Sequence, residues 1–162
     1  AAAAAGRDAA SIASGGPAHG DGRAAALGSA LPADAALRTD ADVLVCGSKL
    51  GLVDHGVAAA SPHRLIVPIG PAPVTAKGLA VASSRDITVL PDFLTTCGPL
   101  HAFRVGDGVT ADEVIGAATT FVADTTAEVL AHDEGPVLGA CYRAEDFLRT
   151  WQEQLPFGRP LA

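Results

Sequence analysis

Three short stretches of nearly continuous apolar residues follow one another in the middle of the chain, roughly 22 residues apart. They are "ADVLVCG" at 41–47, "RLIVPIG" at 64–70 and "DITVLPD" at 86–92. Continuous rather than alternating hydrophobicity is typical of strands that are buried on both faces, as in a parallel sheet. The pattern therefore predicts three parallel strands in one sheet.

The segments between these strands have the length of crossover helices. Val53 to Ala60 is the first candidate, and Ala76 to Ser83 is the second, with Thr75 placed to cap its first turn. Parallel neighbours in a sheet need such crossovers. We therefore expect a β-α-β-α-β unit.

A longer amphipathic pattern follows the third strand. Thr110 and Glu113 form a capping box of the type T-x-x-E, which marks the start of a helix. The side chains that then fall on one helical face are Val114, Ala118, Phe121, Val122, Thr125 and Val129. The pattern predicts a long helix from about Ala111 to Ala131, which "DEGP" at 133–136 ends.

A second, shorter helix is expected from Arg143 to Gln152. Phe147, Leu148 and Trp151 would pack inward from it. Together these elements predict an α/β, Rossmann-like fold: a partial, doubly wound sheet of three parallel strands with crossover helices, then a long C-terminal helix and a shorter one.

The chain divides near Leu31. Residues 1–30 are an Ala/Gly/Ser mixture in which only Ile12 and Leu27 are large and apolar, too few to offset the entropy of ordering. We expect a low-complexity segment or an interrupted element there. The 162 residues suffice for one domain with a sizeable core, expected at 31–155, and residues 156–162 are expected to form a loose tail.

Composition excludes several classes of partner. Aromatic residues make up 4% of the chain, so Val, Leu, Ile and Ala must form the core. The net charge is −7 and the lysines are Lys49 and Lys77, which leaves no basic stripe for nucleic acid. No apolar run approaches the roughly 20 residues of a membrane span, and the N-terminus has no continuous signal segment. We expect a cytoplasmic protein without nucleic-acid or membrane partners.

Cysteine and methionine usage adds two expectations. Cys46, Cys97 and Cys141 are odd in number and widely spaced, which favours reduced thiols. The sequence contains no methionine, so we expect that an upstream part has been lost or belongs to a longer protein.

Small, glycine-containing turns follow all three predicted strands, at 46–48, 70–73 and 95–98. In an open α/β sheet, ligands bind in the crevice beyond the carboxyl ends of the strands. We therefore expect the three turns to be the wall and floor of a binding site. The alternative for each one is that glycine and proline simply make a tight turn.

The segment from about Ala41 to Phe103 resembles the C-terminal, dinucleotide-binding domain of the glutamate/leucine/phenylalanine/valine dehydrogenase family. The resemblance rests on "ADVLVCG", "IVPIGPAPVT" and "VLPDFLTTCG". The family has a D-(V/I)-L-(V/I)-P-A-A strand, an I-V-x-G-A-N-x-P-(T/V)-T loop and a V-L-V-x-P-D-(F/I)-x-x-N-A-G-G turn. The long helix after Thr110 fits the closing helices of that domain.

The resemblance implies reversible oxidative deamination of an L-amino acid to a 2-oxo acid, with hydride passing to NAD or NADP. The family's catalytic lysine and aspartate lie on a separate N-terminal domain, and no residue of this chain is assigned a catalytic role. A strand followed by G-x-G-x-x-G is also absent from the sequence. We therefore expect the second half of the cofactor domain, inactive when isolated, in a complete protein that is a homo-oligomer.

The resemblance also implies the site residues. The cofactor-binding positions are Gly47, Ser48, Gly70 and Pro71, and the substrate-side positions are Thr96 and Gly98. Pro71 and Thr96 stand where the family has asparagines. Proline has no hydrogen to donate, and a hydroxyl has fewer donors than an amide.

Other interpretations stay open beside this one. Cys97 and His101 could suggest a metal pair or a nucleophilic thiol, but a second pair at zinc-ligand spacing is absent, and we expect no metal. Asp54 and His55 could form a proton relay, although a helix-start aspartate and a surface histidine is the simpler interpretation. The alternative to an enzyme fragment is a degenerate, non-catalytic module that pairs with another chain.

Overall fold

The computed structural model describes residue 35 and the ranges 37–47, 49–104 and 108–152. The predictions for residues 1–30 and 156–162, and for Ser48, lie outside the described residues. No helix in the described part of the chain combines the length and the apolar character needed to cross a membrane.

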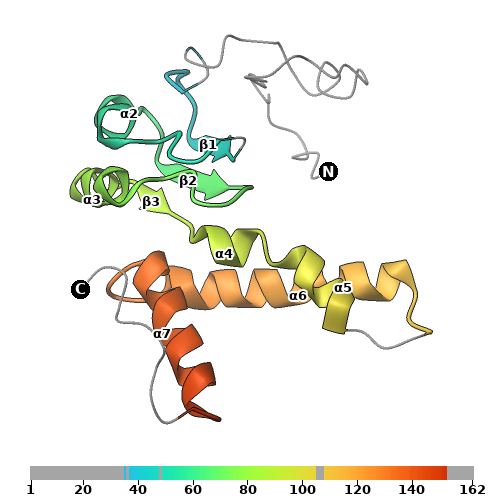
Figure 1. Cartoon of the computed structure of the whole chain (residues 1–162). Coiled ribbons are helices and arrows are strands. Elements are labelled where there is room, and N and C mark those ends of the chain that lie inside the picture. The colour runs from blue at the N-terminus through green and yellow to red at the C-terminus, as the bar shows by residue number, and fades with distance from the viewer. Residues whose placement is uncertain (1–34, 36, 48, 105–107, 153–162) are drawn as a thin grey trace, which may run out of the picture.

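The centre of the fold is a parallel sheet of three strands in the order β1-β2-β3 (Figure 1). The strands are β1 (Val43–Cys46), β2 (Leu65–Pro68) and β3 (Thr88–Val89). Leu44 lies opposite Ile66, and Ile66 lies opposite Val89. The predicted partial Rossmann-like sheet is confirmed.

Two crossover helices connect the strands, α2 (His55–Ala60) and α3 (Ala76–Ser84). The cap predicted for the second one is confirmed, because the Thr75 hydroxyl accepts a hydrogen bond from the amide of Gly78 at 3.0 Å. The first helix starts later than predicted. Asp54 is its N-cap and accepts from the amide of Val57 at 2.9 Å.

The main core lies between α2, α3 and one face of the sheet. Its buried members are Leu44, Cys46, Val53, Ala58, Ile66, Ala82, Ile87 and Val89. The opposite face differs from the expectation of burial on both sides. Val43 and Val45 of β1 are 46% and 56% exposed, because no described element packs over them. Successive strand residues point to opposite faces, so β1 is buried on one face only.

Four helices follow the sheet: α4 (Asp92–Thr95), α5 (Gly98–Arg104), α6 (Ala111–Leu130) and α7 (Pro136–Arg149). The predicted polar turn at 95–98 is therefore partly helical, since α4 begins directly after β3. The capping box of α6 is confirmed: the Glu113 amide donates to the Thr110 hydroxyl at 3.3 Å, and the Thr110 amide donates to Glu113 Oε2 at 2.9 Å.

The prediction for α7 was wrong in its start and in its packing. The helix begins at Pro136 rather than at Arg143, because Gly135, with φ of 86°, is its N-cap and proline suits the first helical position. Phe147 is 65% exposed and Trp151 is 61% exposed, so neither packs inward, whereas Leu148 is half-buried.

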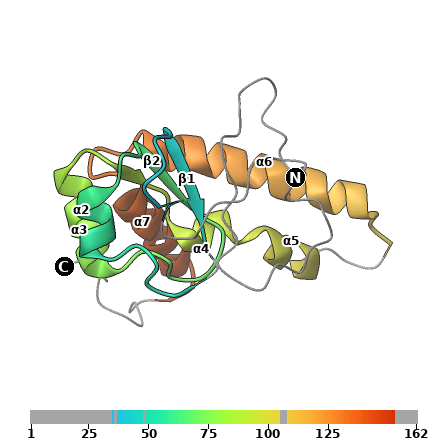
Figure 2. The ribbon, with the colours of Figure 1, turned by 90° about the horizontal axis from the view of Figure 1, so that it is seen from above.

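The first half of α7 packs against the end of α6 instead. A Cβ atom at Gly139 would lie 2.7 Å from Cβ of His132, so only glycine permits this approach. A second, smaller core forms there from Leu94, Val129 and Ala140. Figures 1 and 2 show that α5 and the first half of α6 project away from the sheet.

Candidate functional site

The turns after β1 and β2 touch through their backbones at the carboxyl edge of the sheet. A Cβ atom on Gly70 would lie 2.1 Å from the carbonyl oxygen of Gly47, and one on Gly47 would lie 2.4 Å from the Gly70 nitrogen. The Ile69 amide also donates to the carbonyl of Cys46 at 2.7 Å. Two of the four cofactor-binding positions expected from sequence are therefore adjacent, and their contact requires glycine at both.

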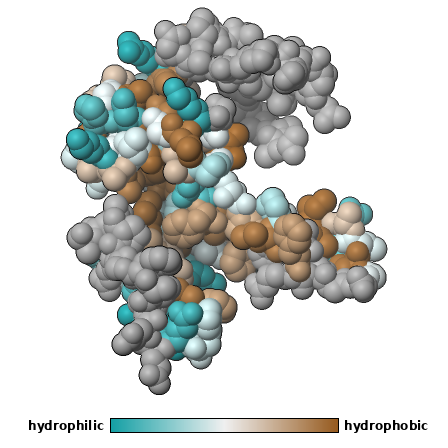
Figure 3. Space-filling view, viewed as in Figure 1, coloured by the Kyte–Doolittle hydropathy of each residue, from teal (hydrophilic) through white to brown (hydrophobic). Residues whose placement is uncertain are grey.

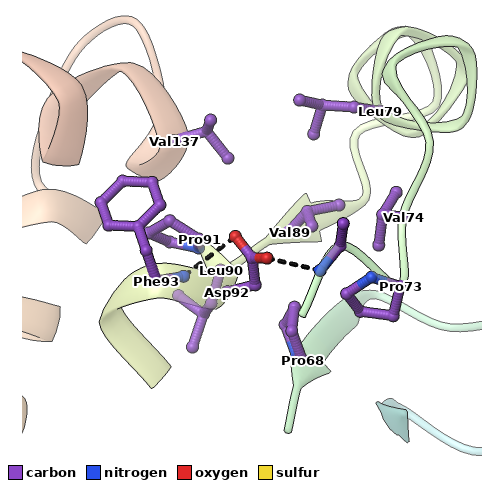
Figure 4. Close-up of a pocket in the computed structure, with 11 residues that line it drawn as sticks. Pro68, Pro73, Val74, Leu79, Val89, Leu90, Pro91, Asp92, Phe93 and Val137 are labelled. Atoms are coloured by element: carbon purple, nitrogen blue, oxygen red, sulfur yellow. Dashed lines mark hydrogen bonds between the residues drawn. The ribbon is translucent and has the colours of Figure 1, made fainter. Parts of the chain in front are cut away.

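The turns after β2 and β3 are joined by a side chain. Oδ2 of Asp92 accepts a hydrogen bond from the amide of Ala72 at 2.6 Å, and its Oδ1 accepts from the amide of Phe93 at 2.9 Å (Figure 4). All three turns thus lie at the same edge, as the strand order requires.

The remaining expected site residues differ in their exposure and in the hydrogen bonds that they can make to a ligand. Pro71 is exposed, and Gly98, half-buried at the start of α5, has open space beside its Cα. The hydroxyl of Thr96 donates to the backbone carbonyl of Asp92 at 2.7 Å. That hydroxyl is therefore committed to its own helical turn and keeps only its lone pairs for a ligand.

A cavity of about 140 Å³ opens beside the Asp92 carboxylate. Prolines and aliphatic side chains from β2, α3, β3 and α7 form its walls, and Leu79 and Val137 face each other across it (Figure 4). Ligand pockets usually measure roughly 300–1,000 Å³. The cavity is therefore too small to hold a dinucleotide by itself.

Ala72 lies in the turn at 70–73 that was expected to line the site, but neither Ala72 nor Asp92 was among the individual site residues predicted from the sequence. Asp92 belongs to the P-D pair of the quoted family turn, which was the one signal that could have singled it out. Ala72 carries no signal, because its role is played by its backbone alone.

The cysteines are not suited to nucleophilic chemistry. Burial raises the pKa of the Cys46 thiol to about 11, and burial also raises the pKa of Cys97 and of Cys141. Such thiols stay protonated at neutral pH, and the thiolate is the reactive form. Cys46, Cys97 and Cys141 form no disulfide in the structure.

The sequence also offered two other candidate sites, a proton relay at Asp54 and His55 and a metal site. Asp54 caps α2, and the hydrogen bond from the Val57 amide holds the pKa of its carboxyl below the usual value. The interpretation as a helix-start aspartate is confirmed, and His55 is exposed. Within the described ranges, no three histidine, cysteine, aspartate or glutamate side chains gather where they could hold a metal ion.

No family model and no curated protein matches the chain. Among solved structures, L-tryptophan dehydrogenase from Nostoc punctiforme is similar with a TM-score of 0.64 and 13% identity, over 79% of this chain and 39% of that one. Glutamate dehydrogenase from Peptoniphilus asaccharolyticus is similar with a TM-score of 0.52 and 19% identity, over 67% of this chain and 32% of that one. The chain thus spans well under half the length of either protein, and what it shares with these two amino-acid dehydrogenases is a partial Rossmann-like fold.

Proposed function

We propose that this chain is the second half of the cofactor-binding domain of an NAD- or NADP-dependent L-amino-acid dehydrogenase. The reaction would be oxidative deamination to a 2-oxo acid. The observation that carries the proposal is the meeting of three short turns at the carboxyl edge of a parallel sheet, in a fold shared with two amino-acid dehydrogenases. The resemblance of "IVPIGPAPVT" and "VLPDFLTTCG" to the family's loops supports it.

The residues at this edge fit the nicotinamide end of the cofactor better than its pyrophosphate. Gly47 and Gly70 present backbone without side chains, and exposed Pro71 adds a small apolar surface beside them. A phosphate would be poorly placed at the start of α2, because the Asp54 carboxylate already occupies its first amides. We assign Gly47, Ser48, Gly70 and Pro71 to the nicotinamide side, where the bound cofactor would accept hydride from the substrate carbon.

Thr96 and Gly98 are assigned to the substrate side of the same crevice. Gly98 leaves open space at the start of α5, and Thr96 lies in the turn directly before it. In this proposal the pyrophosphate-binding turn, the catalytic lysine and the catalytic aspartate come from other parts of a longer protein. The chain's own part is to hold and orient the reacting ends of cofactor and substrate.

Calorimetric titration of the 162-residue chain with NADH and NADPH tests whether the rest of the cofactor site lies outside this chain. We expect no dissociation constant below about 1 mM, which corresponds to about −4 kcal/mol, because the phosphate-cradling turn is not among these residues. Tighter binding would show that the chain carries a complete cofactor site, and the proposal of a half-domain would fail.

The coding sequence upstream of Ala1, expressed together with this chain, gives the second test. We expect it to supply a strand followed by G-x-G-x-x-G and a lysine-bearing domain, and the joint product to reduce NAD or NADP with an L-amino acid. A start codon close to Ala1 would contradict the proposal.

A non-catalytic binding module remains a second candidate, and one observation favours it. Pro71 has no donor, and the Thr96 hydroxyl is committed to the Asp92 carbonyl, so both positions lack the donors of the family's asparagines. Pro71→Asn combined with Thr96→Asn in the complete protein separates the candidates. If the site is catalytic, each restored hydrogen bond, at roughly 0.5–1.5 kcal/mol, should raise turnover of glutamate or leucine by up to about tenfold. Unchanged turnover and cofactor affinity would favour the module.

A further inference from the structure

Ala72 has an unusual backbone conformation in the middle of the second turn. Its φ is 42°, in the left-handed region that residues with a Cβ atom adopt rarely. The side chain is exposed, so packing of the methyl group does not force this conformation. Such a conformation costs free energy and persists only where its surroundings fix it.

Hydrogen bonds of both the amide and the carbonyl of Ala72 hold its backbone in this conformation. Its amide donates to Oδ2 of Asp92, the first residue of α4 after β3, at 2.6 Å, and its carbonyl accepts from the amide of Gly51, which follows the first turn, at 2.9 Å. The left-handed conformation lets one residue reach the segments that follow both β1 and β3. Ala72 therefore connects the second turn to the segments that follow the other two strands.

Asp92 is itself held firmly in place. Its Oδ1 accepts from the amide of Phe93 at 2.9 Å, and its backbone carbonyl accepts from the amide of Thr96 at 2.9 Å and from its hydroxyl at 2.7 Å. Buried Leu90 and Pro91 anchor the chain immediately before it. A carboxylate fixed in this way can hold the amide of Ala72, and a bond to an ionised acceptor is stronger than a neutral one.

We propose that Asp92 is a positioning residue that locks the second turn in its strained conformation and so sets Pro71 at a fixed place relative to Thr96. The importance of these two positions for ligands rests on the proposed function. The lock itself rests only on the hydrogen bonds and the backbone angle of Ala72. The simpler role would be that Asp92 only caps the first turn of α4 through the Phe93 amide.

Amide hydrogen exchange of the full 162-residue chain, followed by NMR, distinguishes the two roles. For Asp92→Ala we expect exchange at Ala72 and Gly51 to rise by at least about tenfold, while Ile66 in β2 keeps its protection. Asp92→Asn should recover part of the protection at Ala72, because its amide oxygen can still accept one bond. Because the Ala72 amide bonds to a carboxylate, we expect its proton resonance to lie downfield in the original chain and to lose that shift in Asp92→Ala.

Asp54→Ala is the matched control, since Asp54 also accepts an amide at the start of a helix but joins no second turn. We expect it to raise exchange at Val57 and to leave Ala72 unchanged. The proposed role of Asp92 would be wrong if Asp92→Ala left the exchange rate of the Ala72 amide unchanged. It would also be wrong if the exchange rates of Ala72 and Ile66 rose equally.

Ala72→Gly tests the strain, and it is combined with Asp92→Asn in place of Asp92→Ala so that the test can be made even if Asp92→Ala does not fold. Glycine adopts the left-handed conformation readily, so Asp92→Asn should raise exchange at Gly51 less in the Ala72→Gly background than in the original chain. If Asp92→Asn raised exchange at Gly51 equally in the original chain and in Ala72→Gly, strain at Ala72 would have no part in the effect. No cofactor is used in these measurements, so a failed NADH titration bears on the proposed function and not on the lock.

Discussion

The sheet unit, formed by β1–β3 with α2 and α3, and the helical unit, formed by α4–α7, are built on very different cores. Among the described residues, the buried cluster of the sheet unit has eight members, including Val53 and Ile66 with no exposed surface. The cluster of the helical unit, counted in the same way, has three, Leu94, Val129 and Ala140. Since apolar burial is the main source of stability, the sheet unit should resist unfolding more than the helical unit does.

The two units do not differ in this way at their surfaces, because both expose large apolar side chains (Figure 3). In the sheet unit Val45 is 56% exposed and Ile69 is 64% exposed, and in the helical unit Phe103 is 86% exposed and Ile115 is 62% exposed. An amphipathic pattern can form a helix without a partner for its whole apolar face. A parallel strand such as β2 makes its backbone hydrogen bonds to neighbouring strands, so it forms only together with them.

The largest expected effect comes from the centre of the sheet unit. Ile66→Ala should lower the free energy of unfolding by about 2–5 kcal/mol, because it opens a cavity in a fully buried site. Urea unfolding measures the change. Ile115→Ala, the same deletion at a site 62% exposed on α6, is the control and should change stability by less than about 0.5 kcal/mol. Similar losses for both would contradict the comparison.

A smaller loss is expected in the core of the helical unit. Val129 is 1% exposed, and Val129→Ala should cost about 1.5–3 kcal/mol. Hydrogen exchange should rise in α6 and α7 while the amides of β2 keep their protection. An equal rise in β2 would show that the two units unfold as one and would remove the distinction between them.

The start of α6 should be sensitive to its capping box. Thr110→Ala removes the side chain that accepts the Glu113 amide and should cost about 1 kcal/mol, expressed as fraying of the first turns. Exchange of the amides at 111–114 measures it. Thr120→Ala, at an exposed position further along the same helix, should leave these amides unchanged.

Acid should weaken the same helix start. The hydrogen bonds from the Thr110 amide and hydroxyl lower the pKa of Glu113 below its usual value. The folded state therefore binds this proton less readily than the unfolded state, so the stabilising effect is full above the unfolded pKa and is lost as the pH falls through the lower, folded pKa. Protection of the amides at 111–114, measured relative to the unfolded chain at the same pH and compared between pH 6 and pH 3 with Glu113→Gln as the control, should show an acid-dependent loss that the variant lacks.

The smallest effect is expected at the exposed side of α7. Phe147→Ser should change the free energy of unfolding by less than about 0.5 kcal/mol, because the ring is 65% exposed. A loss above about 1 kcal/mol by urea unfolding would indicate that Phe147 packs inward after all, as its position in the sequence pattern had suggested.

Local patterns were enough to predict the strands, α3 and α6. Continuous apolar runs mark β1 to β3, and the caps at Thr75 and Thr110 act on amides three residues away, so their signals are contained in a few consecutive residues. The positions of the three turns at one edge follow from the same strands, because parallel strands place their carboxyl ends together.

The apolar pattern of a helix did not predict which neighbour the helix packs against. Gly135 and Pro136 were interpreted as the end of one helix, although the same two residues also start the next. The outward direction of Phe147 is set by the close approach of Gly139 to His132, a contact between α7 and the segment that follows α6. An apolar residue on a helix can face either a neighbour or solvent, and only packing decides between them.

The sequence by itself determined the three strands, α3 and α6, their order, and the common edge of the sheet at which the turns after the strands lie. The tertiary structure decided how that edge is held. Asp92 and Ala72 are 20 residues apart, and their hydrogen bond exists because β2 and β3 lie side by side and the backbone of Ala72 is left-handed. The backbone amide is the same at every residue except proline, so only the folded chain shows that Ala72 connects the second turn to the segments that follow β1 and β3.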